Sequence, residues 1–144
     1  STLIIEGEGN YKIEYNFTII ETIEGVENAE VYVGNVTPII SGGILYLNGN
    51  AYTSNTIIDV PGNYTLEIRG AGSYYKKILF IVKPEKINVI NGETYFYSLI
   101  PAVSKGTLTL NDLPYTSGEI LNESGSYTLK VVGEGGYLEI INFN

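Results

Sequence analysis

The sequence contains an internal duplication at an offset of 63 residues, and this feature limits the possible folds more than any other. The two copies align without a gap from about Val26 to about Tyr75, and roughly 20 positions in that window are identical. The longest matches pair Leu45-Tyr46-Leu47-Asn48 with Leu108-Thr109-Leu110-Asn111, Tyr52-Thr53-Ser54 with Tyr115-Thr116-Ser117, and Gly62-Asn63-Tyr64-Thr65-Leu66 with Gly125-Ser126-Tyr127-Thr128-Leu129. A repeat of this length indicates one structural unit that occurs twice along the chain.

The boundary between the two units falls near Pro84. We therefore expect one domain over residues 21–84 and a second over residues 85–144, with residues 1–20 as a separate N-terminal segment. A chain of 144 residues is long enough for two small domains of this kind.

Both units alternate short β patterns with turn residues, and no amphipathic helical stretch is visible. Tyr64, Leu66 and Ile68 share one face of a strand, while the residues between them share the other face. Strands are expected over residues 30–33, 36–40, 44–48, 56–60, 64–69 and 75–82 in the first unit, and 93–100, 107–111, 119–122, 127–132 and 137–143 in the second. Short strands separated by Gly- and Asn-rich turns predict an all-β chain of two tandem sandwich domains.

The segment from Asp59 to Leu66 resembles the entry to strand F of immunoglobulin-like domains, where a Tyr hydrogen-bonds back across the corner. The succession Leu-Asn-Gly, Tyr-Thr-Ser and Gly-x-Tyr-Thr-Leu resembles the Ig-like repeats of prokaryotic cell-surface proteins, and it covers most of both units. The glycine turns after Arg69 and Val132 depart from the Asp-x-Ala-Gly-Asn of many such repeats. The chain is also similar to the two-domain subunits of archaeal thread-like pili, which are joined by donor-strand exchange. These resemblances imply two Ig-like domains and an extracellular location at the cell surface.

The composition leaves little room for catalysis. There is no Cys and no His, so the usual nucleophile–base pairs and zinc sites cannot be built. Asp59 and Asp112 are the only aspartates, so the acidic loop of an EF-hand is missing. The net charge of -8 argues against a nucleic-acid partner, and the longest apolar run, from Ile78 to Val82, is too short to span a membrane. We expect no enzyme activity, catalytic residue, metal, cofactor, nucleic-acid partner or membrane span.

Four Asn-x-Ser/Thr signals for N-glycosylation occur, at Asn16, Asn35, Asn63 and Asn122. Pro38 directly follows the signal at Asn35 and disfavours its use. Two interpretations stay open: the four residues are glycosylation sites, or they are ordinary polar residues of turns and strand ends.

The N-terminal segment belongs to neither full unit. Gly9-Asn10-Tyr11-Lys12-Ile13 echoes Gly62-Asn63-Tyr64-Thr65-Leu66, but no glycine turn follows it. Apolar and polar side chains then alternate through residues 11–20, which predicts one long extended strand. One interpretation makes residues 1–20 an edge strand or hairpin of their own chain. The other makes them a donor strand that adds to the sheet of a neighbouring subunit.

Two functions follow from these observations. The first is a subunit of an extracellular filament, assembled head to tail by donor-strand complementation with copies of itself. The second is a spacer or adhesive Ig-like repeat of a larger prokaryotic cell-surface protein, which would contact neighbouring repeats and, if adhesive, cell-surface ligands.

Overall fold

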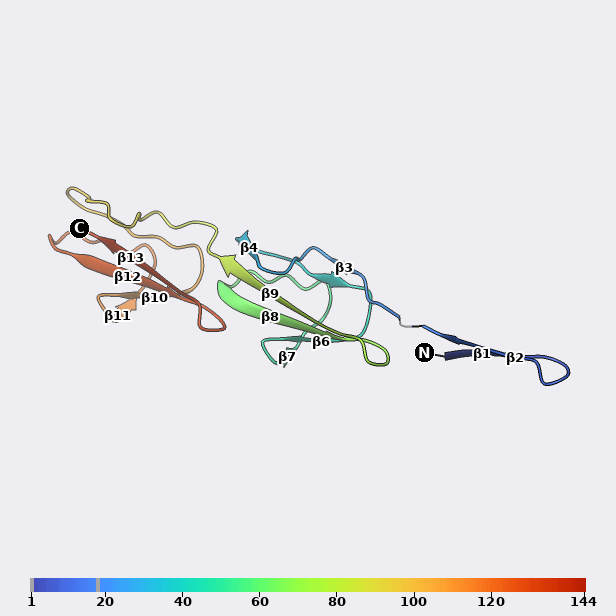
Figure 1. The fold of residues 1–144 in the computed structure, drawn as a ribbon. Coiled ribbons are helices and arrows are strands. Elements are labelled where there is room, and N and C mark those ends of the chain that lie inside the picture. The colour runs from blue at the N-terminus through green and yellow to red at the C-terminus, as the bar shows by residue number, and fades with distance from the viewer. Residues whose placement is uncertain (1, 18) are drawn as a thin grey trace.

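The computed structural model describes residues 2–17 and 19–144, and within this part the chain is all β with no helix. Figure 1 shows an elongated molecule with three sheet-containing parts in a row: an N-terminal hairpin, a middle part and a C-terminal part. The several sheets and the two cores described below are consistent with a β-sandwich architecture.

The middle part is organised around a five-stranded sheet with the order β4-β9-β8-β6-β7. Its strands are β4 (Glu30–Val33), β6 (Ile44–Leu47), β7 (Asn50–Ala51), β8 (Gly62–Arg69) and β9 (Tyr75–Lys83). A second, two-stranded sheet pairs β3 (Ile23–Glu24) with β5 (Ile39–Ile40). Antiparallel pairing holds β9, β8, β6 and β7 together, whereas β4 joins β9 in parallel.

The C-terminal part repeats the antiparallel portion of this order, and its described residues form no equivalent of β4. Its sheet runs β11-β10-β12-β13, built from β10 (Thr107–Leu110), β11 (Leu113–Tyr115), β12 (Tyr127–Val132) and β13 (Leu138–Phe143). The pairing register is also repeated at the 63-residue offset, because Leu66 lies opposite Ile78 in the first unit and Leu129 lies opposite Ile141 in the second. The duplication in sequence is therefore a duplication in strand order and register.

Each unit has its own apolar core. Leu66 and Ile68 of β8 are fully buried, as are Leu129 and Val131 of β12. In the first unit the core continues onto the smaller sheet through residues such as Ile40, so the apolar side chains lie between the two sheets. The inward face expected from the alternation in the sequence is confirmed by this burial.

Side-chain hydrogen bonds at the ends of the strands are repeated as well. Asn48 and Asn111 both have a φ of +48°, and their Oδ1 atoms accept the backbone N–H of Thr65 and Thr128, each at 2.8 Å. Asparagine tolerates this left-handed backbone and bonds the chain locally, which explains why both units keep Leu-x-Leu-Asn before the turn.

Four expected strands are shorter in the structure or absent from it, and one of them, over residues 36–40, is reduced to β5 and an isolated bridge at Val36. Residues 56–60 and 119–122 contribute only the isolated bridges of Ile58 and Leu121. Residues 93–100 form no regular strand, although Tyr95 donates its N–H to the carbonyl of Asn144 and starts the ladder that β4 makes in the first unit. Asn144 in turn donates its N–H to the carbonyl of Glu93 at 3.1 Å.

The prediction of one long strand over residues 11–20 is wrong. Instead, β1 (Thr2–Glu6) and β2 (Lys12–Asn16) form an antiparallel hairpin, joined by a turn in which Gly7 donates its N–H to Tyr11 at 2.9 Å. A glycine turn is present, but it precedes Tyr11 instead of following it. Thr18, which the predicted strand included, lies outside the described residues.

No helix in residues 2–17 and 19–144 is long and apolar enough to cross a membrane.

The buried face of β8 gives a stability prediction. Leu66→Ala should lower the free energy of unfolding by about 2–5 kcal/mol, because the side chain is fully buried and its removal leaves a cavity. Leu113→Ala is the matched control, since Leu113 is 69% exposed, and it should change the value by less than about 0.5 kcal/mol. Denaturant unfolding, monitored separately in each unit, measures the free energy of unfolding of both variants. If the two substitutions lower it equally, the inward face of β8 is wrongly assigned.

Candidate functional site

The most specific contact between distant parts of the chain is the joint between the two units. The β12–β13 turn, Gly133-Glu134-Gly135, lies against the start of β8 at Pro61-Gly62-Asn63, as Figure 1 shows. Glu134 donates its N–H to the carbonyl of Pro61 at 2.8 Å, and Asn63 donates its N–H to the carbonyl of Glu134 at 2.9 Å. The turn therefore adds to the first unit as one step of a parallel β ladder.

Two glycines make this approach possible. A Cβ on Gly133 would lie 1.9 Å from the carbonyl oxygen of Pro61, and a Cβ on Gly135 would lie 2.0 Å from that of Asn63. Neither distance is compatible with a side chain, because the blocking atoms belong to the backbone and cannot rotate away. Gly135 also has a φ of +59°, whereas Gly133 has no positive φ. The need for glycine at position 133 therefore comes from the joint, not from the conformation of the turn.

An ion pair crosses the same joint. Lys105 of the second unit contacts the carboxylate of Asp59 in the first unit, and this hydrogen bond lowers the pKa of Asp59. Both side chains are 40% or more exposed, so solvent screening keeps the contribution of this pair small. The backbone contacts at the glycine turn are thus the main determinant of the joint.

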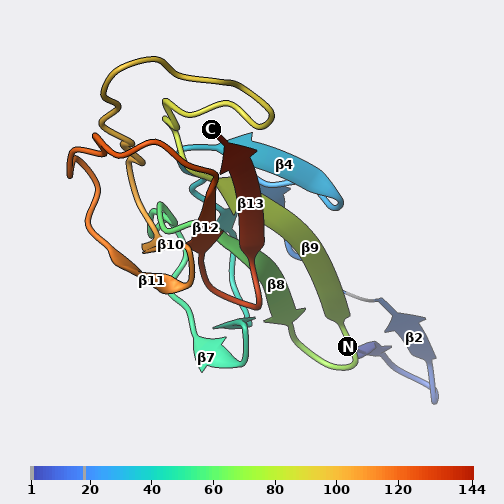
Figure 2. The ribbon, with the colours of Figure 1, turned by 90° about the vertical axis from the view of Figure 1, so that its left-hand side faces the viewer.

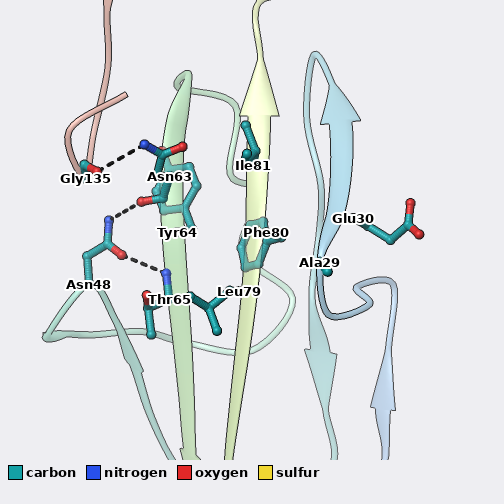
Figure 3. A pocket seen from close by; sticks show the side chains of 10 residues that line it. All are labelled: Ala29, Glu30, Asn48, Asn63, Tyr64, Thr65, Leu79, Phe80, Ile81 and Gly135. Carbon is teal, nitrogen blue, oxygen red and sulfur yellow. Dashed lines mark hydrogen bonds between the residues drawn. The ribbon is translucent and has the colours of Figure 1, made fainter. Parts of the chain in front are cut away.

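A hollow of about 540 Å³ opens beside the joint, and Figure 3 shows the side chains that line it. Its wall combines the rings of Tyr64 and Phe80 with a chain of amide contacts. Within that chain, Asn48 Nδ2 donates to the carbonyl of Asn63 at 3.2 Å, and Asn63 Nδ2 donates to the carbonyl of Gly135 at 3.3 Å. The side chains thereby connect the first unit to the turn of the second.

The joint also covers the corner tyrosine of the first unit. Tyr64 and Tyr127 occupy equivalent positions, and each donates its hydroxyl to the carbonyl four residues earlier, at 2.7 Å. The repeated Gly-x-Tyr-Thr-Leu pattern predicts that both tyrosines are buried. This is confirmed for Tyr64, which is 6% exposed, and wrong for Tyr127, which is half-buried. Glu134 and the ring of Tyr64 both lie against Gly62, where a Cβ would be 2.9 Å from Glu134 and 2.8 Å from the ring. Among the described residues, no turn makes the equivalent backbone bonds to the residues just before Tyr127.

The burial of Tyr64 has an electrostatic consequence. The pKa of the Tyr64 hydroxyl is raised to about 12. Burial is the largest cause, and the negative charges of Glu134 and Asp59 add to it. Both causes disfavour the phenolate. Because Glu134 belongs to the second unit, the ionisation of Tyr64 reports on whether the joint is closed.

The four glycosylation signals lie in different surroundings. Asn16, Asn35, Asn63 and Asn122 are all exposed. Asn16 ends β2 and accepts a hydrogen bond from Thr2 through its Oδ1 atom, while the Thr18 of its signal lies outside the described residues. Asn63 is engaged at the joint through its Nδ2 atom, which is the atom that would carry a sugar. The structure therefore does not bring the four residues together into one site.

Within the described ranges no group of three or more His, Cys, Asp or Glu side chains could hold a metal ion. The sequence predicts Gly133 and Gly135 only as turn residues, and it does not indicate that their turn contacts the other unit. The signal that the sequence offers is the recurrence of both turn glycines, at positions 70 and 133 and at positions 72 and 135.

The close approach of Gly133 to Pro61 predicts that Gly133→Ala opens the joint. Opening should move the pKa of Tyr64 from about 12 toward the ordinary tyrosine value of about 10, because Glu134 and the cover over the ring are withdrawn. The amide protons of Asn63 and Glu134 should exchange faster in the same variant, while Leu129 keeps its protection.

Gly70→Ala is the matched control, since Gly70 holds the same place in the β8–β9 turn and the atoms nearest to a Cβ there belong to the side chain of Tyr74 in the same turn. This variant should leave the titration of Tyr64 unchanged. If Gly133→Ala also leaves it unchanged in a correctly folded chain, the glycine contact does not hold the joint.

No family model, no curated protein and no solved structure matches this chain. Its function is therefore inferred from the repeat, the joint and the surfaces described above.

Proposed function

We propose that this chain is part of a rod-like spacer of a prokaryotic cell-surface protein, in which Ig-like sandwich domains are stacked end to end. The domains span residues 21–84 and 85–144, and the protein has no enzymatic activity. The observation that carries the proposal is the joint, where a backbone turn of one unit is seated on the corner of the unit before it.

The Ig-like character is supported by the two corners. In immunoglobulin-like domains a tyrosine at the start of strand F bonds back to the backbone a few residues upstream. Tyr64 does this to Val60 and Tyr127 does it to Glu123. Both tyrosines also stack on a Phe of the next strand, Tyr64 on Phe80 at 5.5 Å between ring centroids and Tyr127 on Phe143 at 5.4 Å.

The joint suits a spacer because it is directional. The turn of the second unit contacts the corner of the first unit, so the two surfaces that meet are different. Contacts of this head-to-tail kind can repeat without closing on themselves. When they occur between successive units of one chain, they produce a linear array in which each unit contacts only its neighbours.

A filament subunit that assembles by donor-strand complementation is the second candidate. The observation that favours it is the exposed apolar surface of the N-terminal hairpin, where Leu3, Ile5 and Tyr15 are 44–51% exposed. An isolated two-stranded hairpin is only marginally stable in water, so a partner for this surface is expected. The spacer is favoured because residues 2–16 are already paired with each other as a hairpin.

An extracellular location predicts N-linked glycans on the native protein. Asn122 is expected to be modified first, because it is exposed and takes no part in the hydrogen bonds of the joint. Asn63 is expected to be modified least, since its Nδ2 atom is bonded to Gly135 and a sugar there would crowd the turn. Mass spectrometry of peptides from natively purified protein measures the occupancy at all four signals. Unmodified peptides at every one of them, or a higher occupancy at Asn63 than at Asn122, would contradict this expectation.

A spacer of stacked domains should also resist extension one unit at a time. When the chain is stretched in a force spectrometer, each unit should unfold in a separate step that releases roughly 200 Å of polypeptide, as expected for about 60 residues at their extended length. The two cores are separate, so loss of one should leave the other intact. A single step of about twice that length, or extension without a force peak, would contradict independent load-bearing domains.

A further inference from the structure

The N-terminal hairpin matches the closing hairpin of both units in sequence. At offsets of 63 and 126 residues, six equivalent positions carry the same residue in all three hairpins. The matching sets are Thr2, Thr65 and Thr128; Leu3, Leu66 and Leu129; Gly7, Gly70 and Gly133; Gly9, Gly72 and Gly135; Tyr11, Tyr74 and Tyr137; and Phe17, Phe80 and Phe143. The shorter echo between Gly9-Asn10-Tyr11 and Gly62-Asn63-Tyr64 is therefore fortuitous.

The three hairpins also share their hydrogen-bonding pattern. Leu3 lies opposite Tyr15, as Leu66 lies opposite Ile78 at the 63-residue offset. The turns close in the same way, because Gly7 donates its N–H to Tyr11 at 2.9 Å and Gly70 and Gly133 make the equivalent bond at 3.0 Å. A match in residues, register and turn identifies one structural element in three places.

The hairpins differ in what covers them. Leu66, Ile68 and Ile78 are 0–2% exposed because the remaining strands of their unit pack against them, whereas the equivalent Leu3, Ile5 and Tyr15 are 44–51% exposed. We propose that residues 2–17 are the closing hairpin of a third copy of the unit. We propose further that the first strands of that copy, carried by the polypeptide N-terminal to Ser1, cover its apolar face.

The position of the hairpin agrees with this assignment. Figures 1 and 2 both show the start of β1 beside the β8–β9 turn, which contains Gly70 and Gly72. In the joint described above, the equivalent Gly133 turn contacts the residues just before Tyr64, and Ser1 is the equivalent of Tyr64. The corner of a third copy would therefore lie where the Gly70 turn can contact it. Figure 1 also shows the three hairpins running in the same direction along the molecule.

The proposal rests on the stacked-domain function and deepens it, because it names the partner of the exposed hairpin. It also specifies the missing sequence. In both complete units an asparagine lies 17 residues before the strand threonine and accepts its N–H, as Asn48 does for Thr65. The polypeptide upstream of Ser1 should therefore carry Leu-x-Leu-Asn, with the Asn 17 residues before Thr2.

The first test is the sequence of the native protein upstream of Ser1, determined by mass spectrometry of the intact chain and of its N-terminal peptides. We expect the polypeptide to continue beyond Ser1 with Leu-x-Leu-Asn at the stated spacing. Ser1 as the native mature terminus, or an upstream segment without this pattern, would overturn the proposal. A native terminus at Ser1 would leave another subunit as the partner of the hairpin, while the joint between the two complete units could still hold.

The second test supplies the missing strands from the chain itself. A copy of residues 20–64 is placed before Thr2 in place of Ser1, which completes a third unit of the same design. We expect amide exchange at Leu3 and Ile5 to slow by roughly 100-fold or more, toward the rates at Leu66 and Ile68. The control carries Leu45→Asp and Ile58→Asp in the added copy only, because both side chains are buried in the first unit.

The control should leave the exchange of the hairpin as fast as in the 144-residue chain. Exchange at Leu66 and Leu129 shows in each protein that the two original units are folded. If these stay protected while the intact extension fails to slow exchange at Leu3 and Ile5, the hairpin is not the closing element of a third unit.

Discussion

The structure depends on one antiparallel hairpin with an apolar inward face and two glycines in its turn. In the middle and C-terminal units this hairpin is β8–β9 and β12–β13, and Leu66 and Leu129 on its first strand are among the fully buried side chains of the two cores. The strands place apolar residues on alternate positions, so the other strands must cover that face. The turn of the second hairpin then makes the contact with the preceding unit. A single element thus supports both the core of a unit and its connection to the next.

The joint uses backbone atoms and therefore places few demands on side chains. Besides the exposed Lys105–Asp59 pair, three hydrogen bonds join Pro61 and Asn63 to the glycine turn, and among these three only the Nδ2 atom of Asn63 comes from a side chain. The main constraint is the absence of a Cβ at Gly133 and Gly135. The side chain of Glu134, between these two glycines, makes none of the three bonds, and the equivalent residue in the first unit is Ala71. The joint also accounts for the unequal burial of the two corner tyrosines, since within residues 2–17 and 19–144 a turn is bonded to the first corner and none to the second.

The sequence predicted the parts of the fold that follow from local patterns. The duplication, the all-β class and the inward face of the strand beginning at Tyr64 are confirmed, because alternation and repeated turn residues act within a few residues. The parallel pairing of β4 with β9 was not predictable, since it joins segments about 50 residues apart through backbone bonds that leave no side-chain pattern. The N-terminal segment was misjudged because alternation alone does not show where a turn interrupts it. The candidate site was missed for a related reason: a glycine required by a distant backbone looks the same in sequence as a glycine required by a turn.

The central claim is that the glycine turn fixes the second unit on the first. Residual dipolar couplings of backbone amides in solution test it directly, because they report the orientation of each sheet against a common frame. The account predicts that couplings from β8–β9 and from β12–β13 fit one alignment tensor in the orientation of Figure 1. Two tensors of clearly different magnitude would show that the units reorient independently, and that the contacts between Pro61 and Glu134 do not hold them.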